Sequence, residues 1–342
     1  MARIKETPLA RPEGVAEGAV VSVFRVQQEM AGMRLDMFLT AEFRRTSRSK
    51  AQAIVRSSAY DAMGARMKPS RRVQAEERIY LWRPPWDETP VPTKIPVIYE
   101  DDDLLVVSKP AGLPVHPTAR YHKNTLIVML KAEREGFLSL AHRLDRETSG
   151  LLILCKTPEA DRGIKHQFED RDGLTKVYRA ITWGLPENHE LGVAKRFECN
   201  MWLPDKAHYG VKMEITSSPE AMHSSTVFTL IESRKAPDGQ TYGLVRCELE
   251  TGRQHQIRVH LQSLGSSIVG DKLYGPDETL FERGADGLLT ADDLDVLELP
   301  RHALHAAELV LRHPMTGEQL KLTAPLPEEL SAFWQQLSPM GT

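Results

Sequence analysis

The chain has 342 residues, with 44 lysines and arginines against 47 aspartates and glutamates, so its formal net charge is −3. A composition of 41% hydrophobic and 27% charged residues excludes a wholly disordered chain and suggests about two folded domains. No apolar run approaches the roughly 20 residues that span a bilayer, and three widely spaced cysteines argue against a disulfide framework, so we expect a cytoplasmic protein.

Composition divides the chain into four predicted parts. Residues 1–19 are polar and are expected to form a loose extension without a secretory signal. Residues 20–83 form a compact segment. Five prolines within 84–96 predict a semi-rigid linker, because proline removes a backbone donor and interrupts helices. Residues 97–330 are predicted to be one larger domain.

The near-neutral sum hides an uneven distribution of charge. Residues 34–83 contain twelve basic and five acidic residues, a net charge of +7, which leaves −10 for the rest of the chain. Residues 276–298 hold eight acids and one base without clear periodicity, and we expect them to be a solvated surface insertion. The sum therefore does not exclude a nucleic-acid partner, which needs locally concentrated positive charge.

Apolar spacing predicts two short helices and a strand in the basic segment. Residues 35–39 place apolar side chains at i, i+3 and i+4, and Ser47 or Ser49 is expected to cap a second helix with apolar positions at 51–55. A short strand is expected at 78–82. The basic residues between the apolar positions would present a cationic face to phosphates, with a merely solvated basic face as the alternative.

This segment resembles a small RNA-binding module that a ribosomal small-subunit protein shares with several RNA-modifying enzymes. The resemblance rests on Arg34-Leu35-Asp36, Ser47-Arg48-Ser49, Met63-Gly64 and Lys68-Pro69-Ser70. Residues 58–64 depart from the Gly-x-Val-x-Val-Asn-Gly pattern that such modules tend to have. The predicted RNA-binding residues are Arg34, Arg44, Arg45, Arg48, Lys50, Arg71 and Arg72.

The most informative motif in the larger domain surrounds Asp145. Residues 151–155 form a continuous apolar run, which predicts a buried strand, and a Ser-Gly pair before it permits a tight turn. Asp145 is therefore expected on a loop at the end of a core strand. Arg143 and Arg146 flank it, and their charges favour the ionised carboxylate that can act as a nucleophile. A surface Asp–Arg cluster without function is the alternative.

The string His-Arg-Leu-Asp-x-x-Thr-Ser-Gly-Leu-Leu at 142–152 resembles the signature of the RluA-type RNA pseudouridine synthases. Further motifs resemble that family in the same order, at 109–117, 176–180, 250–260, 270–275 and 302–306. Gln254 departs from the small hydroxyl residue that is more usual there. The stretches 186–223 and 276–299 have no clear counterpart in the family pattern.

The resemblance implies an α+β catalytic domain with a mainly antiparallel mixed sheet. It implies isomerisation of uridine to pseudouridine within RNA, with no metal and no cofactor. By this resemblance Asp145 is the catalytic aspartate, Tyr178 stacks on the uracil, and Arg258 pairs with Asp145. The sequence itself predicts strands at 177–183 and 243–249 and a helix near 257–264. Whether the aspartate attacks ribose or base, or assists a glycal route, stays open.

Other predicted contacts follow from the need to extrude a stacked uridine from folded RNA. The resemblance suggests that Arg143 fills the gap by stacking, with phosphate contact alone as the alternative. The predicted substrate-binding residues are His142, Arg143, Arg253 and Ile257. His302, His305 and His313 are expected to pack against a helix rather than bind metal, because His-x-x-His without a compact third ligand is weak evidence for a metal site.

We therefore expect a monomeric enzyme that modifies large-subunit ribosomal RNA, with transfer RNA as the alternative substrate. Two other classes of protein compete with this interpretation. One is a catalytically idle RNA-binding or ribosome-assembly protein, against which the combination of Asp145, Tyr178 and Arg258 argues. The other is an RNA glycosidase or nuclease that uses Asp145.

Overall fold

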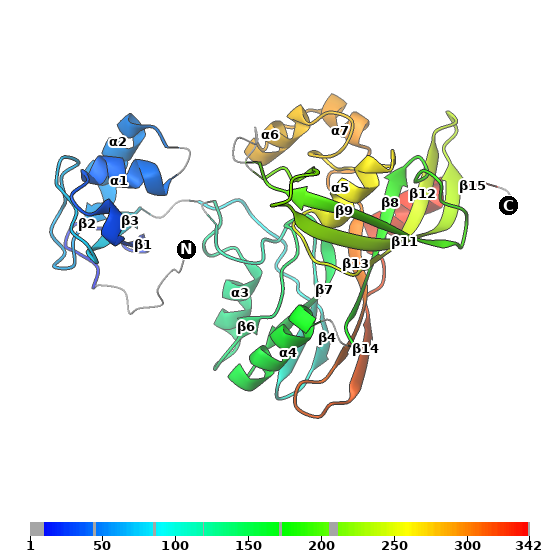
Figure 1. Cartoon of the computed structure of the whole chain (residues 1–342), viewed down its shortest axis with the longest axis horizontal. Coiled ribbons are helices and arrows are strands. Elements are labelled where there is room, and N and C mark those ends of the chain that lie inside the picture. The colour runs from blue at the N-terminus through cyan, green and yellow to red at the C-terminus, as the bar shows by residue number, and fades with distance from the viewer. Residues whose placement is uncertain are drawn as a thin grey trace. The chain divides into compact units, whose positions relative to one another are not determined.

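The computed structural model describes residues 10–43, 46–84, 87–118, 120–170, 173–204 and 211–340. The chain divides into two compact units, 1–88 and 89–342 (Figure 1). The boundary falls inside the predicted linker, and Val91 and Ile95 of that segment pack against the main core of the second unit. Within the described ranges, no helix is long and apolar enough to cross a membrane.

The first unit is a three-stranded antiparallel sheet with two helices. Its elements are β1 (Val20–Arg25), a 3-10 turn (Gln28–Met30), α1 (Leu35–Glu42), α2 (Arg48–Ser58), β2 (Ala59–Tyr60) and β3 (Arg78–Arg83), and the strand order is β1-β3-β2. Buried apolar residues of both helices meet those of β3 in one core. Both predicted helices and the predicted strand are confirmed, and Ser47 is the cap of α2, because its side chain accepts from the Lys50 amide.

The second unit is built on one twelve-stranded sheet. Its path is β10-β9-β11-β12-β8-β13-β7-β5-β4, with β14 beside β13, β15 beside β11 and β6 beside β7. The strands are β4 (Val97–Glu100), β5 (Leu104–Lys109), β6 (Ser139–Leu140), β7 (Ser149–Cys155), β8 (Thr175–Trp183), β9 (Ala194–Trp202), β10 (Glu214–Ile215), β11 (Met222–Lys235), β12 (Thr241–Leu249), β13 (Leu304–Arg312), β14 (Gln319–Thr323) and β15 (Ser338–Pro339).

Only the β13–β7 pairing is parallel among the paired strands described. This confirms the predicted α+β class with a mainly antiparallel mixed sheet. The continuous apolar run of β7 is explained by burial on both faces. Leu152 and Leu154 belong to one core cluster, whereas Leu151 and Ile153 belong to another, as expected for side chains that alternate across a sheet.

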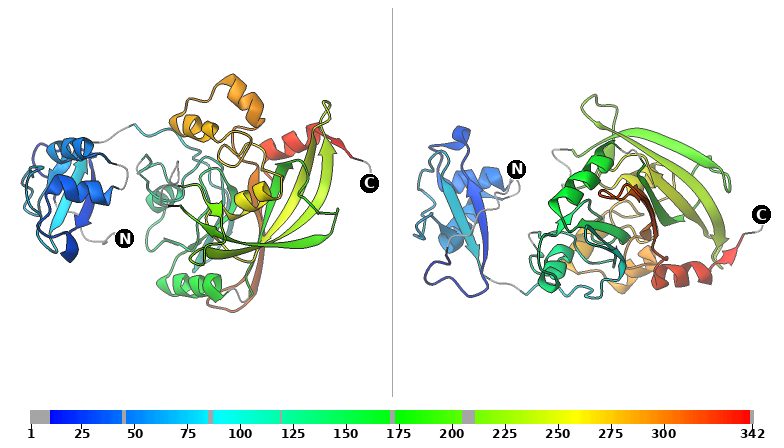
Figure 2. Two further views of the ribbon diagram at one scale, coloured as in Figure 1. Left: turned by 45° about the horizontal axis from the view of Figure 1, so that its top comes forward. Right: turned by 90° about the horizontal axis from the view of Figure 1, so that it is seen from below.

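Six helices accompany this sheet. They are α3 (Leu126–Glu133), α4 (Pro158–Asp170), α5 (Gln256–Ser263), α6 (Thr279–Asp286), α7 (Ala291–Leu297) and α8 (Glu328–Gln336), counted over the described residues. The long strands β9, β11 and β12 curve (Figure 2), and α5 packs against β9 and β11 through His260, whose ring meets those of Phe197 and Phe228.

The acidic stretch 276–298 differs from its expectation. It forms α6 and α7 rather than an irregular loop, and Leu280 and Leu297 are buried. Its end is tied to the sheet, since Trp183 and Tyr242 both donate hydrogen bonds to Glu298. The segment is therefore an ordered part of the second unit with an acidic outer surface.

Candidate active site

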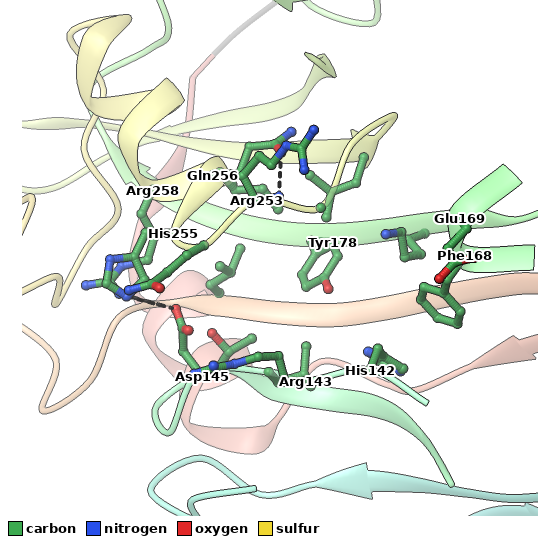
Figure 3. A pocket seen from close by; sticks show the side chains of 18 residues that line it. His142, Arg143, Asp145, Phe168, Glu169, Tyr178, Arg253, His255, Gln256 and Arg258 are labelled. Carbon is green, nitrogen blue, oxygen red and sulfur yellow. Dashed lines mark hydrogen bonds and ion pairs between the residues drawn. The ribbon is translucent and has the colours of Figure 1, made fainter. Parts of the chain in front are cut away.

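A pocket of about 580 Å³ lies over one end of the central strands (Figure 3). Four segments supply most of its walls, and Leu304 of β13 completes them. The segments are the loop 142–148, the end of α4 with Phe168 and Glu169, β8 with Lys176 and Tyr178, and residues 249–258 around the start of α5. All seven residues predicted for catalysis or substrate binding line it, namely His142, Arg143, Asp145, Tyr178, Arg253, Ile257 and Arg258.

The loop that carries Asp145 is anchored at two points that follow this residue in sequence, Arg146 and Gly150. The fully buried Lys109 donates its ammonium hydrogen bonds to the carbonyls of Pro110, Leu113 and Arg146, at 2.8, 3.0 and 2.9 Å. Gly150 has φ +110°, and a Cβ there would lie 2.2 Å from the Ala306 carbonyl oxygen. Only glycine fits this position, where β7 meets β13.

Asp145 interacts with two side chains from the start of α5. Nη1 of Arg258 donates to Oδ2 of Asp145 at 3.3 Å, and Nε2 of His255 lies 3.9 Å from the same oxygen. Among the described residues, no hydrogen bond reaches Oδ1. The Asp145 side chain is 25% exposed, so this oxygen remains available to a ligand in the pocket.

The charges around Asp145 favour its ionised form. Burial opposes ionisation, yet the pKa of the carboxyl is lowered because His255, Arg258, His302 and Arg143 together outweigh burial. Burial lowers the pKa of His255 to about 4 and that of His302 to about 3, so both imidazoles are neutral at pH 7. At neutral pH the arginines, rather than these histidines, therefore carry full positive charge near Asp145.

Arg258 is itself held by a second carboxylate. Its Nε and Nη2 donate to the two oxygens of Asp271 at 2.6 and 2.8 Å, a bidentate pair that is almost completely buried. Asp271 also accepts from the amides of Leu273 and Tyr274. The predicted contact of Arg258 with Asp145 is present, but the stronger partner of Arg258 is Asp271, which leaves one Nη to meet Asp145.

Tyr178 lies along the pocket wall between the Asp145 end and the Phe168 end (Figure 3). Burial raises the pKa of its hydroxyl, and the negative charge of Asp145 adds to the shift. The hydroxyl therefore stays protonated at neutral pH and can donate a hydrogen bond. The largely buried ring faces the pocket and offers a flat apolar surface of the kind on which bases stack.

The other predicted substrate-binding residues differ in how strongly the protein holds them. Nε2 of His142 accepts from the Ile153 amide, and its ring stacks on Phe168 with centroids 5.0 Å apart, so it supports the wall. Arg253 donates to the His223 carbonyl. Arg143 is exposed at the pocket rim.

The remaining predicted histidines have structural roles that differ from the expectation. His302 precedes β13 and His305 lies within it, so neither is on a helix. Their rings hydrogen-bond the hydroxyls of Thr148 and Ser149 at 2.8 and 2.9 Å, which ties the end of the Asp145 loop to β13.

One group within the described residues has the composition of a metal site. Ligand atoms of Asp101, Asp103 and His313 lie within 4.8 Å of one another. His313 hydrogen-bonds Asp101 through Nε2 and accepts backbone amides at Nδ1, and Tyr99 also donates to Asp101. These bonds account for the cluster as a link between two turns of the sheet, and its residues are not among those that line the pocket.

The predicted RNA-binding arginines that the structure describes have partners within the first unit. Arg34 binds both oxygens of the fully buried Asp36, at 3.0 and 2.9 Å, and Arg48 donates to it at 3.3 Å. Gln52 and the Met37 amide complete the set of donors to Asp36.

The other predicted RNA-binding residues fall into three groups. Arg71 forms an ion pair with Glu77, and Arg72 donates to the Gly32 carbonyl at 2.7 Å. Lys50 is exposed and forms no ion pair among the described residues. Arg44 and Arg45 lie outside the described residues. Their roles in RNA binding stay predictions.

Sequence reasoning did not assign roles to His255, Asp271 or Phe168. The signal for the first two was available, because both lie inside recognised motifs, at 250–260 and 270–275. Phe168 lies in α4, outside every motif, and only the fold brings it to the pocket.

Comparisons with known proteins indicate the family of the chain. The profile of the RNA pseudouridylate synthase family matches residues 103–263. The chain is 33% identical to the ribosomal large subunit pseudouridine synthase D of Zymomonas mobilis, covering 91% of this chain and 95% of the relative. It is 35% identical to an uncharacterized RNA pseudouridine synthase of Chlorobaculum parvum, covering 93% and 98%.

Two solved human structures share the fold of most of this chain. They are RNA pseudouridylate synthase domain containing 1 and domain containing 4, with TM-scores of 0.57 and 0.53. The sequence identities are 24% and 26%. The first alignment covers 74% of this chain and 91% of that one, and the second covers 72% and 94%.

Proposed function

The chain belongs to the RluA-type family of RNA pseudouridine synthases, and from this premise we propose that it isomerises uridines of large-subunit ribosomal RNA with Asp145 as the catalytic carboxylate. Relatives named ribosomal large subunit pseudouridine synthase D support this choice of RNA. Besides the one from Zymomonas mobilis, they include that of Nitrosomonas europaea, 30% identical over 96% of this chain.

The observation that supports the catalytic role most directly is the environment of Asp145. Its carboxylate is kept ionised by arginine, it faces a pocket wide enough for a nucleoside, and one of its oxygens has no hydrogen bond within the described residues. An ionised carboxylate in a pocket that excludes much of the water can act on a ribose or a base.

The overall reaction needs no oxidant and no co-substrate. The N1–C1′ bond breaks, a C5–C1′ bond forms, the C5 proton leaves, and N1 regains a proton, so atoms and electrons balance within the uridine and its solvent. In this proposal Tyr178 offers its ring to the uracil, Arg258 keeps Asp145 charged, and Arg143 at the rim contacts the surrounding RNA.

We also propose that the first unit binds nucleotides of the RNA other than the reacting uridine. The support is its net charge of +7 over residues 34–83, together with the resemblance of its motifs to a small RNA-binding module. Concentrated positive charge on one module attracts phosphates and gives salt-dependent affinity.

Position-resolved mapping of pseudouridine in total RNA, from cells with and without this gene, tests the substrate. We expect one or more positions of large-subunit ribosomal RNA to lose the modification when the gene is absent. Loss confined to transfer RNA would overturn the proposed substrate while leaving the chemistry intact. Strand scission or release of free uracil by the purified enzyme would overturn the chemistry itself.

The substitution Asp145→Asn tests the catalytic role. It keeps the shape of the side chain and removes its charge, so we expect turnover to fall by at least about 1,000-fold, the scale seen when a nucleophile is removed. RNA affinity should stay within a few-fold, measured by filter binding. Asp102→Asn is the matched control, because Asp102 is exposed and does not line the pocket, and it should turn over like the wild type.

A further inference from the structure

His255 has a backbone conformation that costs free energy. Its φ of 56° and ψ of 15° lie in the left-handed region, which is uncommon for residues other than glycine, although asparagine, aspartate and histidine adopt it more often than the rest. The turn before it is held by Gln256, whose side chain accepts from the Arg253 amide and from the Thr251 hydroxyl. Strain that the surroundings enforce at a pocket wall points to a function for the side chain it places there.

The hydrogen bonds of Tyr274 determine which nitrogen of His255 carries the proton. The hydroxyl oxygen of Tyr274 accepts from the Met213 amide at 2.8 Å, and it lies 2.9 Å from Nδ1 of His255. Tyr274 is 1% exposed, so its own proton needs a protein acceptor, and Nδ1 is the one available among the described residues. Nδ1 is therefore unprotonated, and the proton of the neutral imidazole is on Nε2.

This tautomer directs an N–H group toward Asp145, because Nε2 is the atom that lies 3.9 Å from its Oδ2. The separation exceeds a hydrogen bond, as is common in an active site before its substrate is in place. Arg258 approaches the same oxygen from the same helix. Two N–H groups on the same side of Oδ2, one bonded to it and one 3.9 Å away, would restrict the rotation of the carboxylate and leave Oδ1 for the pocket.

We propose that His255 is a positioning residue for Asp145, and that Tyr274 holds it in the tautomer whose Nε2–H orients the carboxylate. This inference rests on the proposed catalytic role of Asp145. His255 differs from Arg258 in what it contributes. It is neutral at pH 7, so it contributes the dipole of its N–H group, whereas Arg258 contributes charge.

Two substitutions at one position separate this role from a backbone role. The amide nitrogen of glutamine reaches the place of Nε2, whereas the shorter asparagine reaches only the place of Nδ1. Asparagine tolerates the left-handed conformation better than glutamine does. A purely structural role therefore favours His255→Asn, and a role in orienting Asp145 favours His255→Gln.

We expect His255→Asn to lower kcat by about 10- to 100-fold, the usual cost of removing a group that orients a reactive one. KM should change by less than about threefold, since the RNA contacts stay. His255→Gln should recover most of the lost kcat. Tyr274→Phe should lie between the two, because it frees the tautomer but leaves the imidazole.

The pH profile supplies a second readout. Loss of an N–H that favours the carboxylate raises the pKa of Asp145, so the acidic limb of kcat/KM should move to higher pH in His255→Asn. Other groups that influence Asp145 stay in place in that variant, namely Arg143, Arg258, Asp271, His302, Tyr178, Lys109 and Glu147. A structural defect would lower the amount of active enzyme without moving this limb.

The experiment uses single-turnover pseudouridine formation by the full chain on the ribosomal RNA found by mapping, with thermal melting to show that each variant is folded. Equal activity of His255→Asn and wild type, or an acidic limb that does not move, would overturn the inference. So would His255→Gln no better than His255→Asn. A wild type that forms no pseudouridine would instead overturn the proposed function.

Discussion

Asp36 in the first unit and Asp145 in the second are both kept ionised by arginine, but they are satisfied to different degrees. Asp36 is fully buried and accepts from two arginines, a glutamine amide and a backbone amide. Asp145 accepts one hydrogen bond from Arg258, and a quarter of its side chain is exposed to the pocket.

The difference shows how the same pair of residue types serves two purposes. Each oxygen of Asp36 has at least two donors, so its charge organises the first unit and has no capacity left for a ligand. In the second unit both oxygens of Asp271 are hydrogen-bonded. This carboxylate holds Arg258 so that the arginine can keep Asp145 ionised and still leave one oxygen of Asp145 open. Substitutions that remove the contacts of either aspartate test the comparison.

The largest effect, on activity, is expected when Asp145 loses Arg258, its single hydrogen-bond donor among the described residues. Arg258→Met removes the charge and leaves Asp271 buried without its partner, so we expect kcat/KM to fall by about 100- to 1,000-fold. The lowered pKa of Asp145 should rise, and the acidic limb of the rate profile should therefore move to higher pH. Stopped RNA reactions over a pH series measure both.

Arg258→Lys is the matched control for charge. A lysine keeps the positive charge but cannot bind both oxygens of Asp271 and reach Asp145 together, so its activity should lie between those of the wild type and Arg258→Met. If Arg258→Met shows full activity in folded protein, the electrostatic role given to Arg258 is wrong.

A smaller effect, on stability rather than on catalysis, is expected when the fully hydrogen-bonded carboxylate of Asp36 is removed. Asp36→Asn leaves Arg34 and Arg48 without their carboxylate, and we expect it to lower the free energy of unfolding of the first unit by about 2 kcal/mol. The loss is no larger because both arginines are partly exposed to solvent. Urea titration followed by circular dichroism measures this loss.

The same variant has a predictable pH dependence. The pKa of Asp36 is lowered, chiefly by Arg34, so its contribution is fully present above the ordinary aspartate pKa of about 3.9 and is lost as pH falls below it. The difference in stability between wild type and Asp36→Asn should therefore shrink below about pH 4. A constant difference at all pH values would show that the charge of Asp36 is not what stabilises the unit.

The smallest effect is expected at Lys50, which has no acidic partner among the described residues. Lys50→Ala should weaken RNA binding slightly and lower the slope of log affinity against log salt by about 1, the value for one phosphate contact. Arg48→Ala, twelve residues from Asp36 and bound to it, should instead lower stability. Filter binding at several salt concentrations, beside urea titration, distinguishes the two, and an unchanged slope in Lys50→Ala would remove its role in RNA binding.

Much of the fold follows from local signals that the chain itself carries. The strand β7 and the helix α5 were predictable because a run of apolar residues and an i, i+3, i+4 pattern depend only on neighbours in sequence. The helices α6 and α7 were not predicted, because their few buried residues, such as Leu280 and Leu297, make too weak a pattern in an acidic segment. The strand β1 pairs with β3 across the whole first unit, a contact without any local signal.

The residues of the site likewise fall into those that the sequence predicted and those that only the structure shows. Asp145, Tyr178 and Arg258 were predicted from motifs, and the structure brings them to one pocket. The chain of contacts from Asp271 through Arg258, and from Tyr274 through His255, depends on side-chain distances that no spacing in sequence gives. Phe168 reaches the pocket only because α4 packs beside β7, so its position had to be seen.

The two anchors of the Asp145 loop have a consequence for how a substrate is selected. Lys109 binds the Arg146 carbonyl, directly after Asp145, and Gly150 lies against the backbone of Ala306 where the loop enters β7. A loop held in this way does not open to adapt to its ligand, so the deformation must come from the nucleic acid. Extrusion of a stacked base costs a few kcal/mol and costs least where pairing is weak. We therefore expect the rigidity of this loop to make the enzyme select uridines in those parts of the RNA that deform most easily.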